Sequence, residues 1–496
     1  MGRKVGELID STPLNGARID IPARIGWLLR ASRLAQGQPL RALATGTGMA
    51  SSPATLSRLE THGARNSRAI AHYETALDLP YGWLRAPIDV LCRTYSYAPA
   101  ELAAHLPADT LEDFSECCDR VDDAPEGADW LRFAEHHVTG TRGLPLSAIT
   151  PHLHHLAEEL GRAVAVGYTT RYEALAKFRC SEYGAAVADV IREIVLEEGN
   201  QVHADLLSAA SERPTPELAR WCGELLLHDR EDLARSAGLA IQNMRSVGGL
   251  PRAAWTDLAA VFADACNRTV GDEGRRTALA QTLAACDPGF RETVAGLLTT
   301  PLEPPRRPVA WTRDRRNLHY TLATEYAERV AAGRPGEPML ARLIFELLYD
   351  FRATHAVTSS FLLNASPFSP DLQPVLFEAA LDGPDETTRH GAASAFANLM
   401  LPWEATAGTV EPWLASADPV IRSAGLGMAA QSGLRLPAAT LADALSEGGA
   451  VRRSALFAAG MTAHPLLTTL AEDPAMPGDL RAAARWWLRT GPRLQR

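Results

Sequence analysis

The sequence predicts an all-α fold in which a small N-terminal group of helices precedes a much larger region of helical repeats. Apolar residues recur at intervals of three and four positions, as in amphipathic helices, and no sustained strand-like alternation is visible after about residue 98. Gly, Pro, Asp and Asn divide these patterns into stretches of roughly 10 to 16 residues, an ordinary helix length. Near the C-terminal end an arginine-containing motif recurs at spacings of 33, 30 and 29 residues, which is typical of repeated helix pairs.

The first two helices are predicted after residue 24. Gly37 is placed to end the first helix as a C-terminal capping glycine, and Pro39 is compatible with the first turn of the second. The apolar residues at helical spacing, which we expect to face inward from these helices, are Ile25, Leu28, Leu29, Leu40, Leu43 and Ala44.

A turn and two further helices complete this unit before residue 84. Gly46 and Gly48 form the turn, and Met49 is expected to fill its inner side. The inward residues of the third and fourth helices are predicted to be Leu56, Leu59, Ile70, Tyr73 and Leu77. This order of short helices, with a polar outer face on the third, predicts a helix-turn-helix unit whose third helix enters a DNA groove.

Several residues make the similarity more specific. Leu43-Ala44, Gly48, the run from Thr55 to Glu60 and the segment from Ala76 to Pro80 resemble the Cro/C1-type helix-turn-helix regulators, the XRE family. The resemblance covers less than a fifth of the chain. It implies a structural pair between Arg33 and Glu60, and double-stranded DNA as the partner.

The resemblance also implies which residues read bases. They are Pro53, Ala54 and Arg58, of which Arg58 alone carries a strong donor set that could bind guanine O6 and N7. Arg41, Arg65 and Arg68, with Asn66 and Ser67, are expected to contact phosphates. The complete set of predicted DNA-binding residues is Arg41, Ser52, Pro53, Ala54, Thr55, Ser57, Arg58, Arg65, Asn66, Ser67 and Arg68.

The distribution of charge favours DNA contact at the N-terminal end only. Residues 1–90 contain 11 Lys and Arg against 7 Asp and Glu, although the whole chain carries a formal net charge of −10. A protein that wrapped nucleic acid along its length would be basic throughout. With no signal segment and no long apolar run, the expected location is the cytoplasm, in association with the nucleoid and without membrane contact.

The C-terminal repeats resemble HEAT-like helix pairs. Their recurring arginines are Arg389, Arg422, Arg452 and Arg481, and Asp385 and Asp418 lie near the start of the second helix of a pair. Residues 235–239 repeat residues 422–426 almost unchanged, which suggests that the repeats begin far upstream. Stacked pairs form a curved solenoid whose concave surface can bind a protein or peptide effector. An irregular helical bundle is the alternative.

These patterns divide the chain into four parts. Residues 1–95 are the predicted helix-turn-helix domain, 96–300 an α-helical, repeat-like domain, 301–316 a Pro- and Arg-rich linker or loop, and 317–496 the HEAT-like repeats. Composition agrees with a well-cored chain, because 46% of the 496 residues are hydrophobic.

The sequence contains no recognisable catalytic pattern. The phosphate-binding loop, the nucleophile elbow, the zinc-protease motif and the dinucleotide fingerprint are all missing, so we predict no enzymatic activity, catalytic residue or cofactor. The seven cysteines lack a C-x-x-C pair and are expected to be reduced and mainly buried. His155 and Glu159 could hold a metal one helical turn apart, but solvated side chains are the preferred interpretation for them and for His136 and His137.

Together these observations predict a sequence-specific DNA-binding transcriptional regulator. Its helical-repeat region is expected to mediate homodimerisation, effector binding or both, since one small domain with few base contacts binds weakly. The alternative is a protein-interaction scaffold whose N-terminal module tethers it to DNA without specificity, an option favoured by the donor-free Pro53 and Ala54.

Overall fold

The computed structural model describes residues 19–45, 52–63, 67–97, 110–123, 125–140, 142–303, 318–332, 338–350, 352–398 and 405–494. Throughout these ranges the regular elements are helices, which confirms the all-α prediction, and the only β pairing is an isolated bridge between Ala163 and Leu494. None of the described helices combines the length and the apolar character that a membrane span requires.

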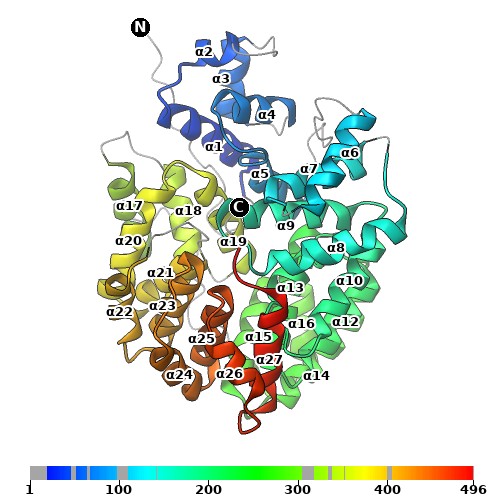
Figure 1. The fold of residues 1–496 in the computed structure, drawn as a ribbon, viewed down its shortest axis with the longest axis vertical. Coiled ribbons are helices and arrows are strands. Elements are labelled where there is room, and N and C mark those ends of the chain that lie inside the picture. Colours follow the sequence, from blue (N-terminus) through cyan, green and yellow to red (C-terminus); the bar gives the residue numbers. More distant parts are fainter. Residues whose placement is uncertain are drawn as a thin grey trace.

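Five helices form the N-terminal unit at one end of the molecule (Figure 1). They are α1 (Ile21–Ala35), α2 (Leu40–Thr45), α3 (Pro53–His62), α4 (Ser67–Ala76) and α5 (Arg85–Thr94).

Local chemistry sets several of these helix ends. The Asp20 side chain accepts from Ala23 N (3.0 Å) and begins α1, and Ser52 accepts from Thr55 N (3.2 Å) at the start of α3. Gly37 follows α1 with φ +64°, as a capping glycine does. The start of α5 is instead capped from a distance, because the Glu74 carboxylate accepts the N–H groups of Leu84 and Arg85.

The small core of this unit is the one that the apolar spacing predicts. The buried members of the predicted set are Ile25, Leu28, Leu29, Leu43, Leu56, Ile70, Tyr73 and Leu77, and the partly buried ones are Leu40, Ala44 and Leu59. Gly26 lets α1 and α3 approach closely, since a Cβ at this position would lie 2.5 Å from Glu60 O. The predicted turn with Gly46, Gly48 and Met49 lies outside the described residues.

A first arm follows the N-terminal unit. Its helices are α6 (Leu111–Asp122), α7 (Gly127–Thr139), α8 (Leu146–Leu160), α9 (Ala165–Cys180), α10 (Gly184–Leu196), α11 (Ala204–Ser211), α12 (Pro216–Leu226), α13 (Glu231–Val247), α14 (Arg252–Arg268), α15 (Glu273–Ala285) and α16 (Pro288–Leu297). Odd-numbered helices from α7 to α15 pack in succession, while α12, α14 and α16 pack in a second row. The first arm therefore consists of two rows of helices around one core.

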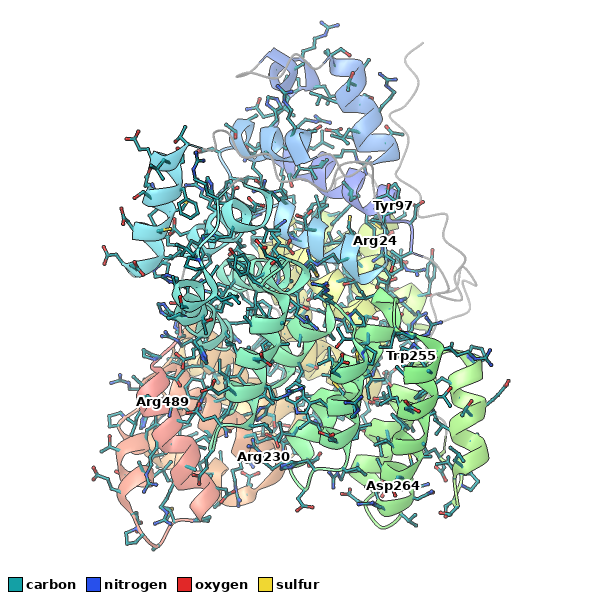
Figure 2. All side chains as sticks on the ribbon, turned by 90° about the vertical axis from the view of Figure 1, so that its right-hand side faces the viewer. Arg24, Tyr97, Arg230, Trp255, Asp264 and Arg489 are labelled. Carbon is teal, nitrogen blue, oxygen red and sulfur yellow. The ribbon has the colours of Figure 1, made fainter. Side chains whose placement is uncertain are left out.

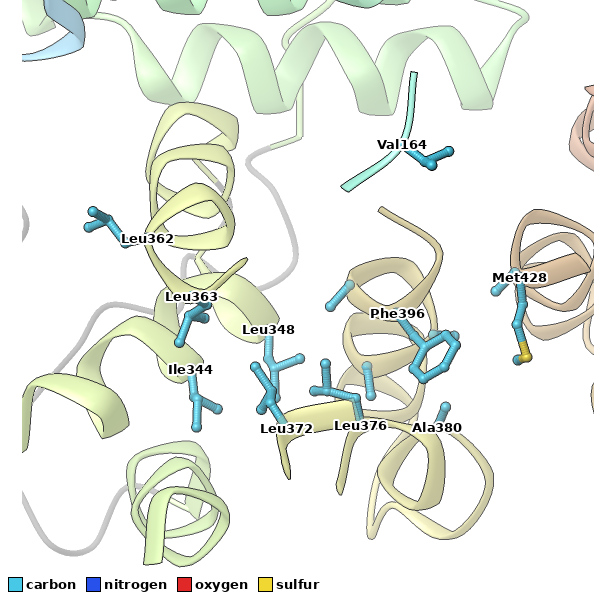
Figure 3. Close-up of a cluster of buried hydrophobic side chains, with 14 of the residues drawn as sticks. Val164, Ile344, Leu348, Leu362, Leu363, Leu372, Leu376, Ala380, Phe396 and Met428 are labelled. Atoms are coloured by element: carbon cyan, nitrogen blue, oxygen red, sulfur yellow. The ribbon is translucent and has the colours of Figure 1, made fainter. Parts of the chain in front are cut away.

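A second arm forms the other side of the molecule (Figure 1). Its helices are α17 (Leu318–Ala331), α18 (Pro338–Tyr349), α19 (Ala353–Ala365), α20 (Ser369–Asp382), α21 (Glu386–Asn398), α22 (Ala407–Leu414), α23 (Pro419–Ser432), α24 (Ala438–Glu447), α25 (Gly449–Met461), α26 (Leu466–Glu472) and α27 (Gly478–Thr490). Here α18, α21, α23, α25 and α27 pack in succession, and α20, α22, α24 and α26 each pair with the helix that follows. Figure 3 shows part of this core, where Leu348, Leu372 and Leu376 gather between neighbouring helices.

The recurring arginines occupy equivalent positions in these pairs. Arg389, Arg422, Arg452 and Arg481 are each the fourth residue of their helix. Two of them reach back to the end of the preceding helix, where Arg389 donates to Gly383 O (3.0 Å) and Arg452 to Leu445 O (2.9 Å). Such bonds satisfy carbonyl groups that a helix C-terminus leaves without intrahelical partners.

An arginine of the first arm also donates to a carbonyl oxygen at the end of the preceding helix. The similarity between residues 235–239 and 422–426 did not point to this arginine. Arg276, the fourth residue of α15, donates to Cys266 O (3.0 Å) in the last turn of α14. Arg235, which the sequence comparison selected, instead contacts Glu231 on its own helix α13. Arg276 thus makes the contact that Arg389 and Arg452 make, whereas Arg235, which the repeated sequence selects, does not.

The two arms also touch through α27 and the segment that follows it. Arg489 of α27 pairs with Glu197 after α10 (2.6 Å), and Leu494 N donates to Arg162 O (2.8 Å). Figure 2 places Arg489 and Arg230 toward the end of the molecule opposite the N-terminal helices. A cavity of about 660 Å³ lies between these arms, with Glu197 and Arg230 on one side and Arg452 and Asp479 on the other.

Several polar residues that we expected to be solvated are buried. His136 and His137 are 5% and 4% exposed, because α7 packs between α6 and α9. Glu159 is also buried and accepts from Arg171 Nε (2.7 Å) and Trp130 Nε1 (2.8 Å), while His155 lies 3.1 Å away. This carboxylate therefore belongs to a hydrogen-bonded ion cluster inside the first arm.

Candidate nucleic-acid interface

The outer face of α3 carries the residues that were predicted to meet DNA. The exposed residues of its N-cap and first two turns are Ser52, Pro53, Ala54, Thr55, Ser57 and Arg58. On the opposite face, Leu56 and Glu60 are 1% and 4% exposed. The helix thus presents one polar, solvent-facing surface at the end of the molecule remote from α24 and α26 (Figure 1).

A buried ion pair fixes the orientation of α3. Arg33 Nε and Nη2 donate to the two carboxylate oxygens of Glu60 at 2.6 and 2.7 Å, and Tyr73 OH donates to the same carboxylate at 2.8 Å. The hydrogen bonds that Arg33 donates to Glu60 raise the pKa of Arg33 despite its burial. The predicted pair between Arg33 and Glu60 is confirmed, and it ties α3 to both α1 and α4.

Two neighbouring helices supply further basic side chains. Arg41 of α2 and Arg68 of α4 are exposed, and His72 Nε2 lies 2.7 Å from Leu43 O, which joins α4 to α2. Ser67 is the first residue of α4. The predicted phosphate contacts Arg65 and Asn66 lie outside the described residues.

The basic excess of the N-terminal sequence overstates the charge of this surface. Arg24 and Arg85 are completely buried, and their carboxylate partners, Glu346 and Glu135, lie outside residues 1–95. Sequence counting cannot distinguish such internal charges from solvent-facing ones, because the partners are distant along the chain.

One of these ion pairs joins α1 to the second arm. Arg24 Nη1 and Nη2 each lie 2.8 Å from a carboxylate oxygen of Glu346 in α18. Arg342 Nε (2.6 Å) and Ser359 Oγ (2.6 Å) donate to the same carboxylate. Burial opposes ionisation, but the Arg24 guanidinium and these other donors hold the pKa of Glu346 well below its usual value.

Apolar contact accompanies this ion pair. The Trp27 indole, which is completely buried, stacks on Phe368 with ring centroids 6.0 Å apart. Figure 2 shows Arg24 where the N-terminal helices meet the rest of the molecule. One end of α1 therefore belongs to the core under α3, and the other end is embedded in the second arm.

The first arm holds α5 through a second charged cluster. Arg85 lies 3.1 Å from Glu135 of α7, and Tyr81 OH also donates to that carboxylate. Arg93 pairs with Glu173 (2.5 Å) and Glu212 (3.1 Å), so α5 contacts α7, α9 and the end of α11. No sequence pattern indicated this cluster, since each residue alone resembles an ordinary polar position on an amphipathic helix.

Comparisons with known proteins add little to this description. No protein-family model and no curated protein matches the chain. Among solved structures, an engineered protein whose crystal structure comes from a structural genomics consortium aligns with 76% of this chain and 98% of its own. Its sequence identity is 14% and its TM-score 0.21, so the likeness carries no argument about fold or function.

Proposed function

We propose that this protein is a sequence-specific DNA-binding transcriptional regulator in which α2 and α3 form a helix-turn-helix and α3 is the recognition helix. The observation that carries the proposal is the two-sided character of α3. Its outer surface carries the exposed polar side chains of Ser52, Thr55, Ser57 and Arg58, while Glu60 on its inner side is held by Arg33 and Tyr73. A rigidly supported helix with a free polar face suits insertion into the major groove.

Within this proposal Arg58 is the main reader of bases. It is exposed on α3, and a guanidinium can donate two parallel hydrogen bonds to guanine O6 and N7. Arg41 and Arg68 supply phosphate contacts from the flanking helices, which fix the position of α3 on the duplex without selecting sequence.

The helical arms complete the proposal. We assign the stacked helix pairs of both arms to a solenoid that mediates homodimerisation or binds a peptide or protein effector. Two copies of the N-terminal unit recognise two half-sites, about one helical turn of DNA or a multiple of it apart. Binding to chromosomal DNA would place the protein in the nucleoid.

The test is selection of bound sequences from a random double-stranded library by the full-length protein at physiological salt. The expected result is a short motif with two-fold symmetry. We expect Arg58→Ala to lose preference at one base of each half-site, with roughly 5- to 100-fold weaker binding. Arg268→Ala is the matched control, because Arg268 is also exposed and, among the described residues, its ion-pair partner is Asp264 on the same helix α14.

A scaffold remains the second candidate because Pro53 and Ala54, at the exposed N-terminal end of α3, offer no side-chain hydrogen bond to a base. In that case binding would be sensitive to salt, without a motif, and equal in the wild type, Arg58→Ala and Arg268→Ala. This result would contradict specific regulation and favour non-specific tethering.

A further inference from the structure

Helix α1 belongs to two parts of the protein at once. Every residue from Ala23 to Arg33 is buried, so this stretch has packing neighbours on all sides. Arg24 and Trp27 contact the second arm, and Arg33 holds Glu60 of α3. A rise of 1.5 Å per residue places Arg24 and Arg33 about 14 Å apart along one helix. The second arm and α3 are therefore linked by a continuous helix, without an intervening loop.

The contact between α1 and α3 is made by backbone atoms. A Cβ added to Gly26 would lie 2.5 Å from Glu60 O and 2.9 Å from the carbonyl carbon of the same residue. Gly63, which follows α3, packs on α1 even more tightly, since a Cβ there would overlap Pro22 O. Backbone atoms cannot rotate aside as side chains do, and a closely packed interior transmits displacement. A shift of α1 must therefore carry the C-terminal end of α3 with it.

The second arm holds the same half of α1 by charge and by ring packing. The Glu346 carboxylate of α18 accepts hydrogen bonds from both terminal nitrogens of Arg24, and both side chains are completely buried. Phe368, at the start of α20, stacks on Trp27, and both rings are buried. Because separating one partner would leave a buried charge without its counter-charge, Arg24 follows Glu346 when the second arm moves.

The first arm reaches α3 by a longer route. Its Glu135 pairs with Arg85 at the start of α5. Helix α5 is joined to α4 through the Glu74 carboxylate, which caps the start of α5, and Tyr73 of α4 then reaches Glu60. The main packing partners of α3 are α1 and α2. A displacement of the first arm therefore passes through α5 and a second helix before it arrives at α3.

We propose that the second arm regulates α3 through α1. A displacement of α18, or of the segment around Phe368, moves α1 as a rigid body and changes the angle at which the outer face of α3 is presented, while the first arm serves as the anchor. Helix α3 has its role in DNA recognition only under the proposed function, on which this regulation rests, whereas the link through α1 is independent of DNA.

The test is hydrogen exchange, followed by mass spectrometry, of the full-length protein without DNA. Glu346→Gln and Glu135→Gln are a matched pair, because each neutralises a completely buried carboxylate that pairs with an arginine of the N-terminal unit. The amides of α3 should exchange at least about tenfold faster than in the wild type in Glu346→Gln, and less than about threefold faster in Glu135→Gln. The amides of α5 should respond more strongly to Glu135→Gln.

Phe368→Ala probes the same link without leaving a charge unpaired, since it removes the ring on which Trp27 stacks. It should also speed exchange in α3 more than in α5. The proposal is overturned if Glu346→Gln leaves α3 as protected as in the wild type, or if the two charge variants affect α3 equally. If Glu346→Gln does not fold, Phe368→Ala against Glu135→Gln decides by the same comparison. The absence of a DNA motif, by contrast, would overturn the proposed function and leave this exchange pattern unchanged.

Discussion

Arg33 and Glu60 form a two-point ion pair that is almost completely shielded from solvent, with both N–O distances below 2.8 Å. The pair joins the end of α1 to the end of α3, and Tyr73 of α4 donates to the same carboxylate. Three helices of the N-terminal unit thus depend on one glutamate, whose position in the chain follows directly after the predicted base-reading residues.

Glu60→Gln should destabilise the N-terminal unit by about 3 to 5 kcal/mol, because it leaves the buried guanidinium of Arg33 without a counter-charge. Hydrogen exchange of the full chain should show faster exchange in α1, α3 and α4. The control is Glu231→Gln, which removes exposed pairs with Arg235 and Arg453 and should change stability by less than about 1 kcal/mol. Unchanged protection of α3 in Glu60→Gln would show that the pair is not needed for its orientation.

The ion pair between Arg24 and Glu346 joins α1 to the second arm. Loss of the Glu346 charge should destabilise the protein as strongly as loss of the Glu60 charge. Glu346→Gln leaves Arg24 and Arg342 buried beside a neutral amide, and we expect a loss of about 3 to 5 kcal/mol in denaturant unfolding. The exposed partner of Arg120, Glu116, gives the matched control Glu116→Gln, which should have little effect.

A compensating variant separates charge burial from packing at this junction. Replacement of all three ionic groups, as Arg24→Met, Arg342→Met and Glu346→Leu, should recover most of the loss, because no unpaired charge remains. A triple variant as unstable as Glu346→Gln would show that the packing of these side chains, rather than their charge, determines stability at this junction.

Gly26→Ala should weaken the packing of α1 on α3 by more than about 1 kcal/mol. The added methyl group would lie 2.5 Å from Glu60 O, a backbone atom that cannot move without the helix. Gly274→Ala in α15 is the control, since its nearest neighbour is the Asp272 side chain at 3.6 Å. This control should be neutral or stabilising by a few tenths of a kcal/mol, as for Gly to Ala replacements in open helix positions. Equal thermal unfolding temperatures for the two variants would contradict the close approach.

Acidification should destabilise the first arm through His137. Burial lowers the pKa of His137 to about 4, and proximity to His136 and His152 acts in the same direction. The unfolded chain, with an ordinary pKa of about 6.5, binds the proton more readily, so stability is present above pH 6.5 and is lost as the pH falls toward 4. We expect this group to contribute about 3 kcal/mol over that interval.

The comparison that isolates His137 is unfolding in denaturant at pH 7 and pH 4.5. His137→Phe, which suits its aromatic surroundings of Phe114, Phe133 and Phe178, should show a smaller loss of stability than the wild type. The control His154→Gln removes a partly exposed imidazole and should retain the wild-type pH dependence. An equal pH dependence in all three proteins would place the titrating group elsewhere.

Residues close together in the chain were the most predictable. The stripe from Ile25 to Leu29, the glycine cap at Gly37 and the exposed face around Arg58 all follow from helical spacing and local backbone preferences. The pair of Arg33 and Glu60 was found through the resemblance of the intervening motif.

Burial of charge was the least predictable property. Arg24 and Arg85 count as basic residues of the N-terminal segment, but their partners, Glu346 and Glu135, lie 322 and 50 residues away. Likewise, nothing near Asn364 in the sequence indicates that this residue lines a cavity together with Trp83 and Gly167.

The sequence by itself determined that the chain is helical and, in the N-terminal unit, which faces of the helices are apolar, because these properties depend on neighbours within one or two turns. Only the tertiary structure decided which charges are internal and where the arms and the N-terminal unit enclose a cavity. Those features depend on which distant helices pack together, and the free energy of an ion pair or a buried amide depends on the partners and the solvent exclusion that this packing creates.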